Sequence, residues 1–283
     1  MAKTILVTGG AGFIGSHLCE RLANEGNTVI SLDNYFTGSK DNHVAGVEYR
    51  EGHTKDIEKH VPESPDLVYH LGEYSRVEQS LEEPELVWDL NKTGTFAVLE
   101  FVRNRGSKII YAGSSTKFGD GGLGRDQSPY AWTKATNTEL VQLYGSWYQV
   151  PYAITYFYNV YGPRERSGKY GTVVEIFRQK VKNKEPLLVN APGSQKRNFT
   201  HVFDIINGLV LVGEKGVGDD FGIGNPKAYS IIEIAEMFGG EITMMPEVKG
   251  NRMGSDIDTI KTGMLGWAPK YSLPDYINSA IDV

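Results

Sequence analysis

The feature that most constrains the fold of this chain is a glycine-rich turn near its start. The sequence ILVTGGAGFIGSHL places Gly9, Gly12 and Gly15 between a short apolar run, Thr4–Thr8, and a segment with helical periodicity, Gly15–Asn24. Here the first glycine permits a tight turn, the second lets the backbone approach a pyrophosphate, and the third lets the helix pack closely on the strand. The phosphates would lie at the helix N-terminus, where unpaired N–H groups favour an anion. Three glycines alone would as readily mark an ordinary turn, so the interpretation depends on the residues further along the chain.

An acidic residue roughly 20 residues beyond the turn supports a dinucleotide ligand. The run Thr28–Leu32 predicts a second strand, and Asp33 and Asn34 follow it directly. A carboxylate at this point accepts hydrogen bonds from the adenosine ribose and repels a 2′-phosphate, which favours NAD over NADP. The alternative is that Asp33 starts a plain turn with Asn34. We therefore expect NAD, held by Gly9, Gly12, Phe13, Ile14, Gly15, Asp33 and Asn34.

Strand and helix signals alternate through the first half of the chain. Buried strands are predicted at Asp66–Leu71, Lys108–Ala112 and Tyr152–Phe157, and helices near Glu85–Arg103 and Tyr130–Tyr148. The alternation predicts an α/β fold of the Rossmann type, a doubly wound parallel sheet with helices on both faces.

After Pro163 the elements become shorter and are broken by Gly, Pro and Lys, as in the predicted helices near Val173–Lys182 and Asp204–Gly213. We expect an NAD-binding Rossmann domain at residues 1–162. Residues 163–283 should form a smaller, partly interleaved substrate-binding region, with some strands and helices returning to the first domain.

Composition excludes several classes of function. The chain has 283 residues and a net charge of −6, which argues against a nucleic-acid surface. The single cysteine, Cys19, excludes an intramolecular disulfide and a Cys-based zinc site. The spacing of His53, His70 and His201 forms no local ligand set, so we expect no metal.

No run reaches the ~20 apolar residues of a membrane span, and the start, MAKTILVTGG, lacks a signal-peptide pattern. We expect a cytoplasmic protein without a membrane or nucleic-acid partner.

A tyrosine–lysine pair provides a candidate base. In YAWTK, Tyr130 and Lys134 stand at i and i+4, so a helix places both on one face. A phenol ordinarily titrates at about pH 10 and is a poor base at neutral pH. A nearby ammonium and the positive nicotinamide ring stabilise the phenolate, and Lys134 can also donate hydrogen bonds to the nicotinamide ribose. This spacing is common by chance, so the pair needs a supporting context.

That context is a run of hydroxyl side chains at the end of a predicted strand. The segment KIIYAGSSTKFG follows the strand with Ser114, Ser115 and Thr116. In a doubly wound sheet the carboxyl ends of the strands face the ligand crevice, where a hydroxyl can bridge a substrate oxygen and Tyr130. The alternative is a Ser/Thr-rich turn that only ends the strand.

Taken with these motifs, the chain resembles the extended short-chain dehydrogenase/reductase family, and within it the nucleotide-sugar epimerase/dehydratase branch. The motifs span nearly the whole chain: VTGGAGFIGSHL, LDNYFTG, HLGEYSRVEQS, LNKTGTFAVLE, GSSTKFG, SPYAWTK, YNVYGPR, QKRNFTHV and MLGWAPKYSL. Their order and spacing are together more specific than any one motif. The resemblance implies a Rossmann fold, NAD as cofactor and a nucleotide-linked sugar as substrate.

The resemblance also implies roles for single residues. The family's catalytic tyrosine and lysine fall on Tyr130 and Lys134, and its catalytic Ser/Thr falls on Ser114. Its diphosphate-contacting asparagine falls on Asn159. Two arginines that usually bind the diphosphate or nucleotide, by the paired hydrogen bonds of a guanidinium, correspond to Arg197 and Arg252. The alternative is that these two arginines are exposed surface charges. The implied substrate site is Ser114, Ser115, Thr116, Tyr130, Asn159, Arg197 and Arg252, and the implied cofactor site also includes Asp56, Ile57, Leu71, Asn91, Tyr130 and Lys134.

The residues after Ser114 favour one reaction of this branch. The family's 4,6-dehydratases carry an Asp-Glu pair directly after the catalytic Ser/Thr, whereas Ser115 and Thr116 stand there, and the glutamate of the decarboxylating relatives is also missing. We therefore expect a UDP-hexose or UDP-N-acetylhexosamine 4-epimerase that oxidises C4 transiently. A 4,6-dehydratase or a 4-ketosugar reductase on a UDP-, GDP- or dTDP-sugar remains open. So does a module of another class that senses NAD without catalysis.

Several positions depart from the family pattern. The loop Gly119–Tyr130 is short and glycine-rich, Gly52–Thr54 replaces a Gly-Asp-aliphatic segment that contacts adenine, and Tyr156 replaces a common basic residue. Glu73 replaces a small residue under the cofactor, and as an acid in the pocket it would favour dehydration. The resemblance further implies a homodimer, with the helices near Glu85–Arg103 and Tyr130–Tyr148 pairing with those of a second copy.

Overall fold

The centre of the molecule is a seven-stranded sheet in which all neighbouring strands are parallel. The computed structural model describes residues 2–115, 124–247 and 257–281. The strand order is β11-β6-β5-β4-β1-β2-β3, so the winding reverses between β1 and β4, which is where such sheets bind ligands. This confirms the predicted doubly wound α/β fold. The strands are β1 (Thr4–Thr8), β2 (Thr28–Asp33), β3 (Val47–Glu51), β4 (Leu67–His70), β5 (Lys108–Ser114), β6 (Tyr152–Phe157) and β11 (Gly218–Ile223).

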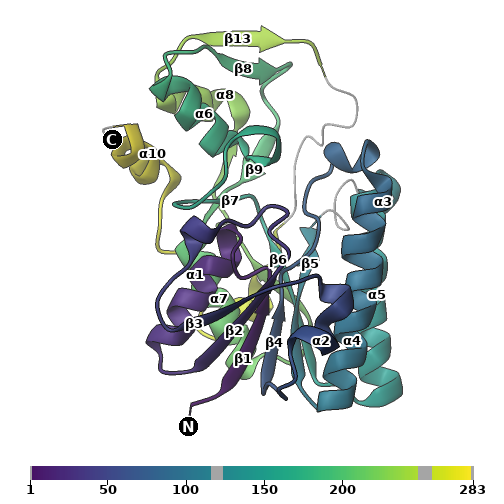
Figure 1. Cartoon of the computed structure of the whole chain (residues 1–283). Coiled ribbons are helices and arrows are strands. Elements are labelled where there is room, and N and C mark those ends of the chain that lie inside the picture. Colours follow the sequence, from purple (N-terminus) through teal and green to yellow (C-terminus); the bar gives the residue numbers. More distant parts are fainter. Residues whose placement is uncertain (1, 116–123, 248–256, 282–283) are drawn as a thin grey trace.

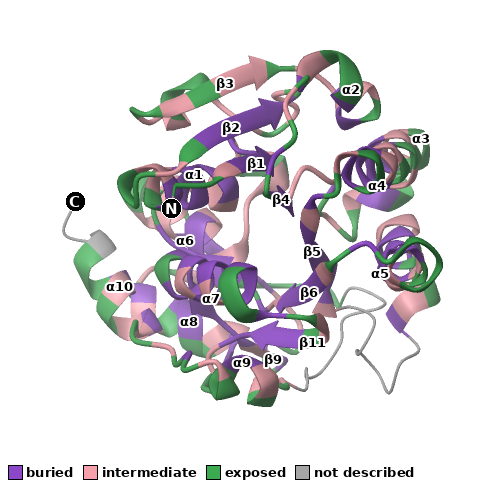
Figure 2. Ribbon diagram, turned by 90° about the horizontal axis from the view of Figure 1, so that it is seen from below, coloured by how far each residue is buried: buried purple, intermediate pink, exposed green. Residues whose placement is uncertain are grey.

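Helices cover both faces of the sheet (Figure 1). On one face α1 (Phe13–Asn24) and α7 (Val202–Lys215) pack together, and on the other lie α4 (Gly94–Arg105) and α5 (Pro129–Tyr148). Figure 2 shows the buried strands between these two layers. Strands covered on both faces need apolar residues at nearly every position, which explains the continuous runs in β1 and β4. Each layer has its own core, with Leu18 and Leu209 on the α1 face and Phe101 and Ile154 on the α5 face.

The long helix predicted near Glu85–Arg103 is interrupted. The chain forms α3 (Pro84–Val87), then a π-helical turn, η4 (Trp88–Thr93), and only then α4. A wide turn of this kind inserts an extra residue into the helical ladder and often lies at a functional site. It places Asn91 in the interior, where it is fully buried.

The second half of the chain divides between the sheet and a smaller layer of its own. Here α7 packs on the central sheet and β11 pairs with β6 within it. The smaller layer (Figure 1) contains α6, α8 and β8. It has a separate core that includes Phe177, Val189 and Ile234. Its elements are β7 (Val160–Tyr161), α6 (Val173–Lys182), β8 (Leu187–Asn190), β9 (Lys196–Asn198), β10 (Thr200–His201), β12 (Ala228–Ser230), α8 (Ile231–Phe238), β13 (Ile242–Met245) and α10 (Leu273–Ile281); the short α2 (Ile57–His60) and α9 (Ile260–Met264) flank the sheet.

Within the described part of the chain, none of the helices has the length and apolar character needed to cross a membrane.

Replacing Gly15 tests the packing of α1 on the glycine turn. A Cβ at Gly15 would lie 2.1 Å from the carbonyl oxygen of Gly9, whereas a Cβ at Gly263 in α9 would meet nothing within 4 Å. Gly15→Ala should therefore lower the free energy of unfolding by about 1–3 kcal/mol through overpacking. Gly263→Ala, the control, should leave it unchanged or raise it by up to about 1 kcal/mol. Urea unfolding measures both, and equal stability of the two variants would contradict the packing described.

Candidate active site

The glycine turn presents unpaired backbone donors at the switch point of the sheet. Gly9 adopts φ +74°, and its N–H donates to the carbonyl of Leu32 at 2.8 Å. Gly12 is the N-cap of α1 and has no side chain to occupy the N–H groups of the first turn, which begins with Phe13 and Ile14. A Cβ at Gly9 would lie 2.9 Å from the backbone of Gly72, so β1 and β4 approach closely here. The backbone therefore fits a pyrophosphate at the N-terminus of α1.

Asp33 ends β2 beside this turn and is nearly buried. Its carboxylate accepts the N–H of Ala11 at 2.9 Å and the N–H of Tyr35 at 2.8 Å. Burial raises the pKa of Asp33, and these two N–H groups partly offset the rise. Each carboxylate oxygen keeps acceptor capacity for a ribose hydroxyl. Asn34 serves the turn itself, because its side chain accepts the N–H of Phe36 at 3.1 Å.

The side chains of Asp56 and Ile57 are occupied by contacts other than the expected ones to adenine. Ile57 is buried in the core on the α5 face, and Asp56 pairs with Lys59 at 2.6 Å. The chain passes next to Asp33 earlier, at Gly52, whose N–H donates to the Asp33 carbonyl at 2.9 Å. The end of β3 therefore lies beside Asp33, and contact of Asp56 and Ile57 with the adenine stays a prediction. Gly52 lies next to Asp33 because β2 and β3 are parallel and their register sets Asp33 opposite Glu51.

Leu71 and Asn91 shape the crevice after β4. Leu71 continues the strand, since its N–H donates to the Thr8 carbonyl at 3.2 Å. Asn91 was expected to contact the cofactor, but its amide holds protein groups: its Oδ1 accepts the N–H of Tyr74 at 2.7 Å and its Nδ2 donates to Thr133 Oγ1 at 3.0 Å. Asn91 therefore ties the loop after β4 to α5 and supports the site from behind.

The structure brings the proposed catalytic hydroxyls together. Ser114 is the last residue of β5, and Tyr130 lies in the first turn of α5, which Ser128 caps by accepting the N–H of Ala131 at 3.1 Å. The phenol of Tyr130 donates to Ser114 Oγ at 3.1 Å. Two residues that are 16 positions apart in sequence thus meet at the carboxyl end of the sheet.

Lys134, one turn further along α5, is buried and fixed by two acceptors. Its ammonium donates to the carboxylate of Glu73 and to the carbonyl of Ala112. Burial would raise the pKa of Glu73, but the charge of Lys134 and the hydrogen bonds it receives hold that pKa below its usual value. Glu73 is therefore ionised at neutral pH. An ionised carboxylate turned toward Lys134 is no proton donor, so the acid role considered for Glu73 finds no support in this geometry.

The expected substrate contacts are only partly within the described residues. Ser115 follows Ser114 directly, and Asn159 lies exposed between β6 and β7 with φ +28°, its Nδ2 donating to the carbonyl of Asn198 at 2.9 Å. Arg197 lies on β9, where it donates to the Lys196 carbonyl. Thr116 and Arg252 lie outside the described residues.

Two charged residues, Arg76 near Tyr130 and Glu165 near Arg76, were missed by the sequence reasoning. Arg76, in the loop after β4, is largely buried, donates to the Tyr170 carbonyl at 2.8 Å and interacts electrostatically with Tyr130 and Glu165. Glu165 follows the YGPR run and accepts the N–H of Thr172 at 2.9 Å. Burial raises the pKa of Glu165 to about 7. The signal in sequence was weak, since a lone Arg in a loop and a Glu after YGPR look like surface charges.

Comparison with known proteins identifies the family. Residues 5–224 match the model of the NAD dependent epimerase/dehydratase family. The chain belongs to this family. It is 31% identical over 298 residues to a putative UDP-glucose 4-epimerase of Methanocaldococcus jannaschii (98% of this chain, 97% of that one). It is also 31% identical over 303 residues to UDP-glucuronic acid decarboxylase 1 of Xenopus tropicalis (99% of this chain, 71% of that one).

The fold agrees with that of solved enzymes. The structure of UDP-glucose 4-epimerase from Thermotoga maritima, determined with UDP-glucose, is similar with a TM-score of 0.91 and 27% identity, covering 99% of this chain and 97% of that one. The protein is thus an NAD-dependent enzyme of the nucleotide-sugar epimerase/dehydratase type, and NAD is its cofactor. Epimerases and decarboxylases both occur among the relatives, so membership of this family does not by itself fix the reaction.

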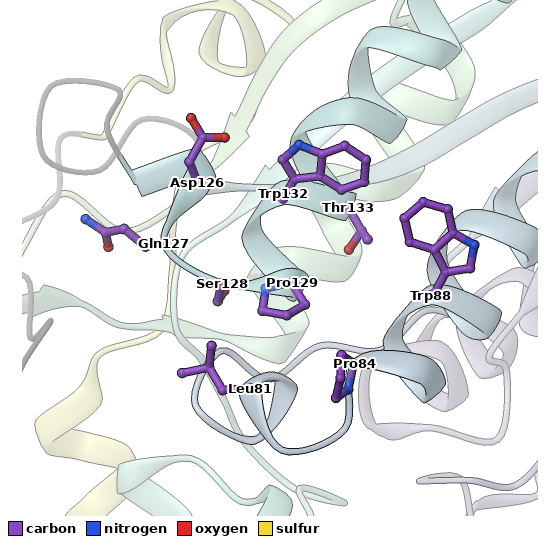
Figure 3. Close-up of a pocket in the computed structure, with 9 residues that line it drawn as sticks. All are labelled: Leu81, Pro84, Trp88, Asp126, Gln127, Ser128, Pro129, Trp132 and Thr133. Atoms are coloured by element: carbon purple, nitrogen blue, oxygen red, sulfur yellow. The ribbon is translucent and has the colours of Figure 1, made fainter.

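A pocket lies beside the start of α5 (Figure 3). Its lining includes apolar side chains, among them Leu81, Pro84 and Pro129, and the polar residues Asp126, Gln127, Ser128 and Thr133. At its edge the rings of Trp88 and Trp132 stack with centroids 5.8 Å apart. Both rings are exposed.

The raised pKa of Glu165 predicts a pH-dependent stability. A carboxyl whose pKa is higher in the folded state binds more protons there, so stability falls as the pH rises from about 4.5 to about 7. Glu165→Gln has no carboxyl to titrate at this position. The free energy of unfolding of the variant minus that of the parent should therefore rise by ~3 kcal/mol when the pH is raised from about 4 to about 8. Urea unfolding at both pH values measures the difference. Exposed Glu236→Gln is the control, and a gain equal to that of Glu236→Gln would contradict the burial of Glu165.

Proposed function

We propose that this enzyme is a UDP-sugar 4-epimerase acting on a UDP-hexose or UDP-N-acetylhexosamine. The observation that carries the proposal is the contact of Tyr130 with Ser114 at 3.1 Å, one helical turn from Lys134, with hydroxyl residues rather than acids directly after Ser114. These groups can oxidise a sugar alcohol reversibly. They provide no carboxyl beside Ser114 that would carry the intermediate on to elimination.

The proposed roles follow from the chemistry of each side chain. Tyr130, as the phenolate, removes the proton of the sugar 4-hydroxyl, and Ser114 holds the same oxygen by a hydrogen bond. Lys134 keeps a positive charge near the phenol and directs a donor toward the nicotinamide ribose. When bound, NAD supplies the acceptor for the hydride of C4. If the 4-keto sugar turns over before the hydride and the proton return, the product is the C4 epimer.

The proposed cofactor site uses the backbone more than side chains. The first-turn N–H groups of α1, after Gly12, bind the pyrophosphate, and Gly9 and Gly15 leave room for it. Asp33 binds the adenosine ribose, and the end of β3 at Gly52 lies under the adenine. Leu71 lines the crevice, and Asn91 supports it from behind. In the substrate site, Asn159, Arg197 and Arg252 are the proposed contacts of the diphosphate and nucleotide.

Dehydration is the second candidate reaction, because Glu165 is a half-buried carboxyl whose pKa of about 7 suits an acid–base role at neutral pH. Glu165 interacts electrostatically with Arg76, which itself interacts with Tyr130, and this supports a location near the proposed site. A 4,6-dehydratase would need such a group near C5 and C6 of the sugar. Ser115 and Thr116 stand where the family's dehydratases carry that acid pair, which is why epimerisation remains the first proposal.

The reaction is decided by product analysis. The purified enzyme is incubated with UDP-, GDP- and dTDP-sugars and the products are examined by NMR. Inversion at C4 without net redox change supports the epimerase. A 4-keto-6-deoxy sugar, loss of carbon dioxide from a uronic acid, or stoichiometric consumption of NADH would instead assign a dehydratase, a decarboxylase or a reductase. Binding of NAD without turnover of any sugar would indicate a sensing module.

Tyr130→Phe tests the proposed base. The variant keeps the ring but loses the proton acceptor, so kcat/KM should fall on the order of 10³-fold. NAD binding and the unfolding midpoint should stay close to those of the parent. Tyr271→Phe, which removes a partly exposed phenol stacked on His201, is the matched control and should keep full activity. Full activity of Tyr130→Phe would refute the mechanism.

We also propose a homodimer formed by α4 and α5. These helices cover one outer side of the sheet (Figure 1) and carry exposed large apolar side chains, Phe96 on α4 and Trp132, Leu143 and Trp147 on α5. Phe96 and Trp147 are more than half exposed. Apolar groups concentrated on one face indicate a protein interface. Helices paired with their symmetry mates would bury them in an isologous contact.

Charged substitutions at this face should break the dimer. Trp147→Glu places a carboxylate in the proposed interface, where a central tryptophan typically contributes more than about 2 kcal/mol, so the dissociation constant should rise at least ~30-fold. Sedimentation velocity at micromolar concentration measures the change. Val217→Glu, at a site that is 76% exposed between α7 and β11, should leave the dimer intact. A parent protein that is already monomeric would remove the proposal.

A further inference from the structure

Glu73 lies just after β4, and its carboxylate is buried behind the proposed catalytic lysine. Its side chain is only 3% exposed, and that of Lys134, with which it forms an ion pair, is 5% exposed. A carboxylate and an ammonium so far from solvent act on each other and on nearby groups with little screening. The pair therefore contributes to the charge that the site presents to Tyr130.

Three donors from three different elements hold the carboxylate in place. One oxygen of Glu73 accepts from Thr95 Oγ1 of α4 at 2.7 Å, from Asn137 Nδ2 of α5 at 2.9 Å and from the Tyr111 phenol of β5 at 3.2 Å. The other oxygen accepts from Lys134. Because both oxygens are held by hydrogen bonds, the carboxylate stays where it meets the ammonium.

The same arrangement directs the lysine. An ammonium has three hydrogens. In the described residues, Lys134 gives one to Glu73 and one to the carbonyl of Ala112. Two fixed acceptors on one side of the nitrogen direct the third hydrogen away from them, toward the crevice in which the cofactor ribose is proposed to bind.

We propose that Glu73 is a positioning residue: it is the counter-ion that fixes Lys134 in the crevice and reduces the effect of the lysine charge on the Tyr130 phenol. The proposal rests on the proposed function, in which Tyr130 takes and returns a proton. An ammonium alone would favour the phenolate strongly. An ammonium in contact with a carboxylate forms a pair with no net charge, and its influence on the phenol is correspondingly smaller.

The other titratable groups around the pair do not replace this carboxylate. His70 of β4 lies between Thr8 and Thr95, and burial lowers its pKa to about 4, so it is neutral. Burial also raises the pKa of Tyr111 well above its usual value, so that phenol stays protonated. Lys92 of η4 donates to Asn137 at 2.8 Å, and Arg76 interacts electrostatically with Tyr130 from the loop after β4. Both are cations, so the negative charge of Glu73 opposes the positive charge of the other charged groups named here.

Glu73→Gln tests the proposal, because the amide keeps the shape of the side chain and loses the charge. The ammonium of Lys134 then acts on Tyr130 without its counter-ion. Tyrosinate absorbance, taken as the difference from the same protein carrying Tyr130→Phe, should appear about one pH unit lower than in the parent. The acidic limb of kcat/KM should move in the same direction. Glu63→Gln removes an equal charge from an ion pair with Arg50 elsewhere in the chain and should move neither curve.

A second variant covers the case in which an unpaired buried ammonium prevents folding. Glu73→Gln combined with Lys134→Gln removes the whole neutral pair, so the tyrosinate titration should stay within a few tenths of a pH unit of the parent. If Lys134 acted on Tyr130 without compensation, the double variant would titrate about one pH unit or more higher. That result, or a folded Glu73→Gln variant with an unshifted tyrosinate titration, would overturn the proposal. The absorbance needs no substrate, so it stays informative if the enzyme proves to catalyse another reaction.

Discussion

The parallel alignment of β1, β4 and β5 is the constraint on which the proposed site depends. Because neighbouring strands run in the same direction, their carboxyl ends meet at one edge of the sheet, and the chain leaves that edge at Gly9, Glu73 and Ser114. The close approach of Gly9 to Gly72 is possible because neither has a side chain. Helix α5 then crosses this edge with Tyr130 and Lys134 in its first two turns. No single segment contains the site, and the sheet brings its parts together.

Much of the fold follows from the sequence, because buried strands and amphipathic helices have distinct apolar periods. The central strands are apolar at nearly every position, and all of them were predicted. The edge strands were not: Val47–Glu51 alternates with charged residues, and Gly218–Ile223 contains two aspartates and two glycines. An edge strand is partly open to water, so its sequence resembles that of a loop. The π-helical turn around Asn91 was also missed, because its cause is tertiary.

The site shows the same division between local and tertiary information. The pairing of Tyr130 with Lys134 depends on helical spacing, and that of Ser114 with Tyr130 on strand ends, so both could be predicted. The sequence shows that Glu73 departs from the family pattern, but its role could not be predicted. Its partners Thr95 and Asn137 come from two helices that are distant in the sequence. A sequence shows that a carboxyl is present, whereas its partners decide whether it is an acid, a base or a counter-ion.

A counter-ion on the lysine is consistent with a reaction in which one residue must both remove and return the same proton. A group that exists almost entirely as the phenolate would take the proton readily and return it poorly, and transfer in both directions is fastest when neither form is strongly favoured. In dehydration, the other candidate reaction, a proton is also transferred at a different position of the sugar. A separate acid such as Glu165 would be needed for that transfer. The burial of Glu73 against Lys134 is thus consistent with proton transfer in both directions at Tyr130.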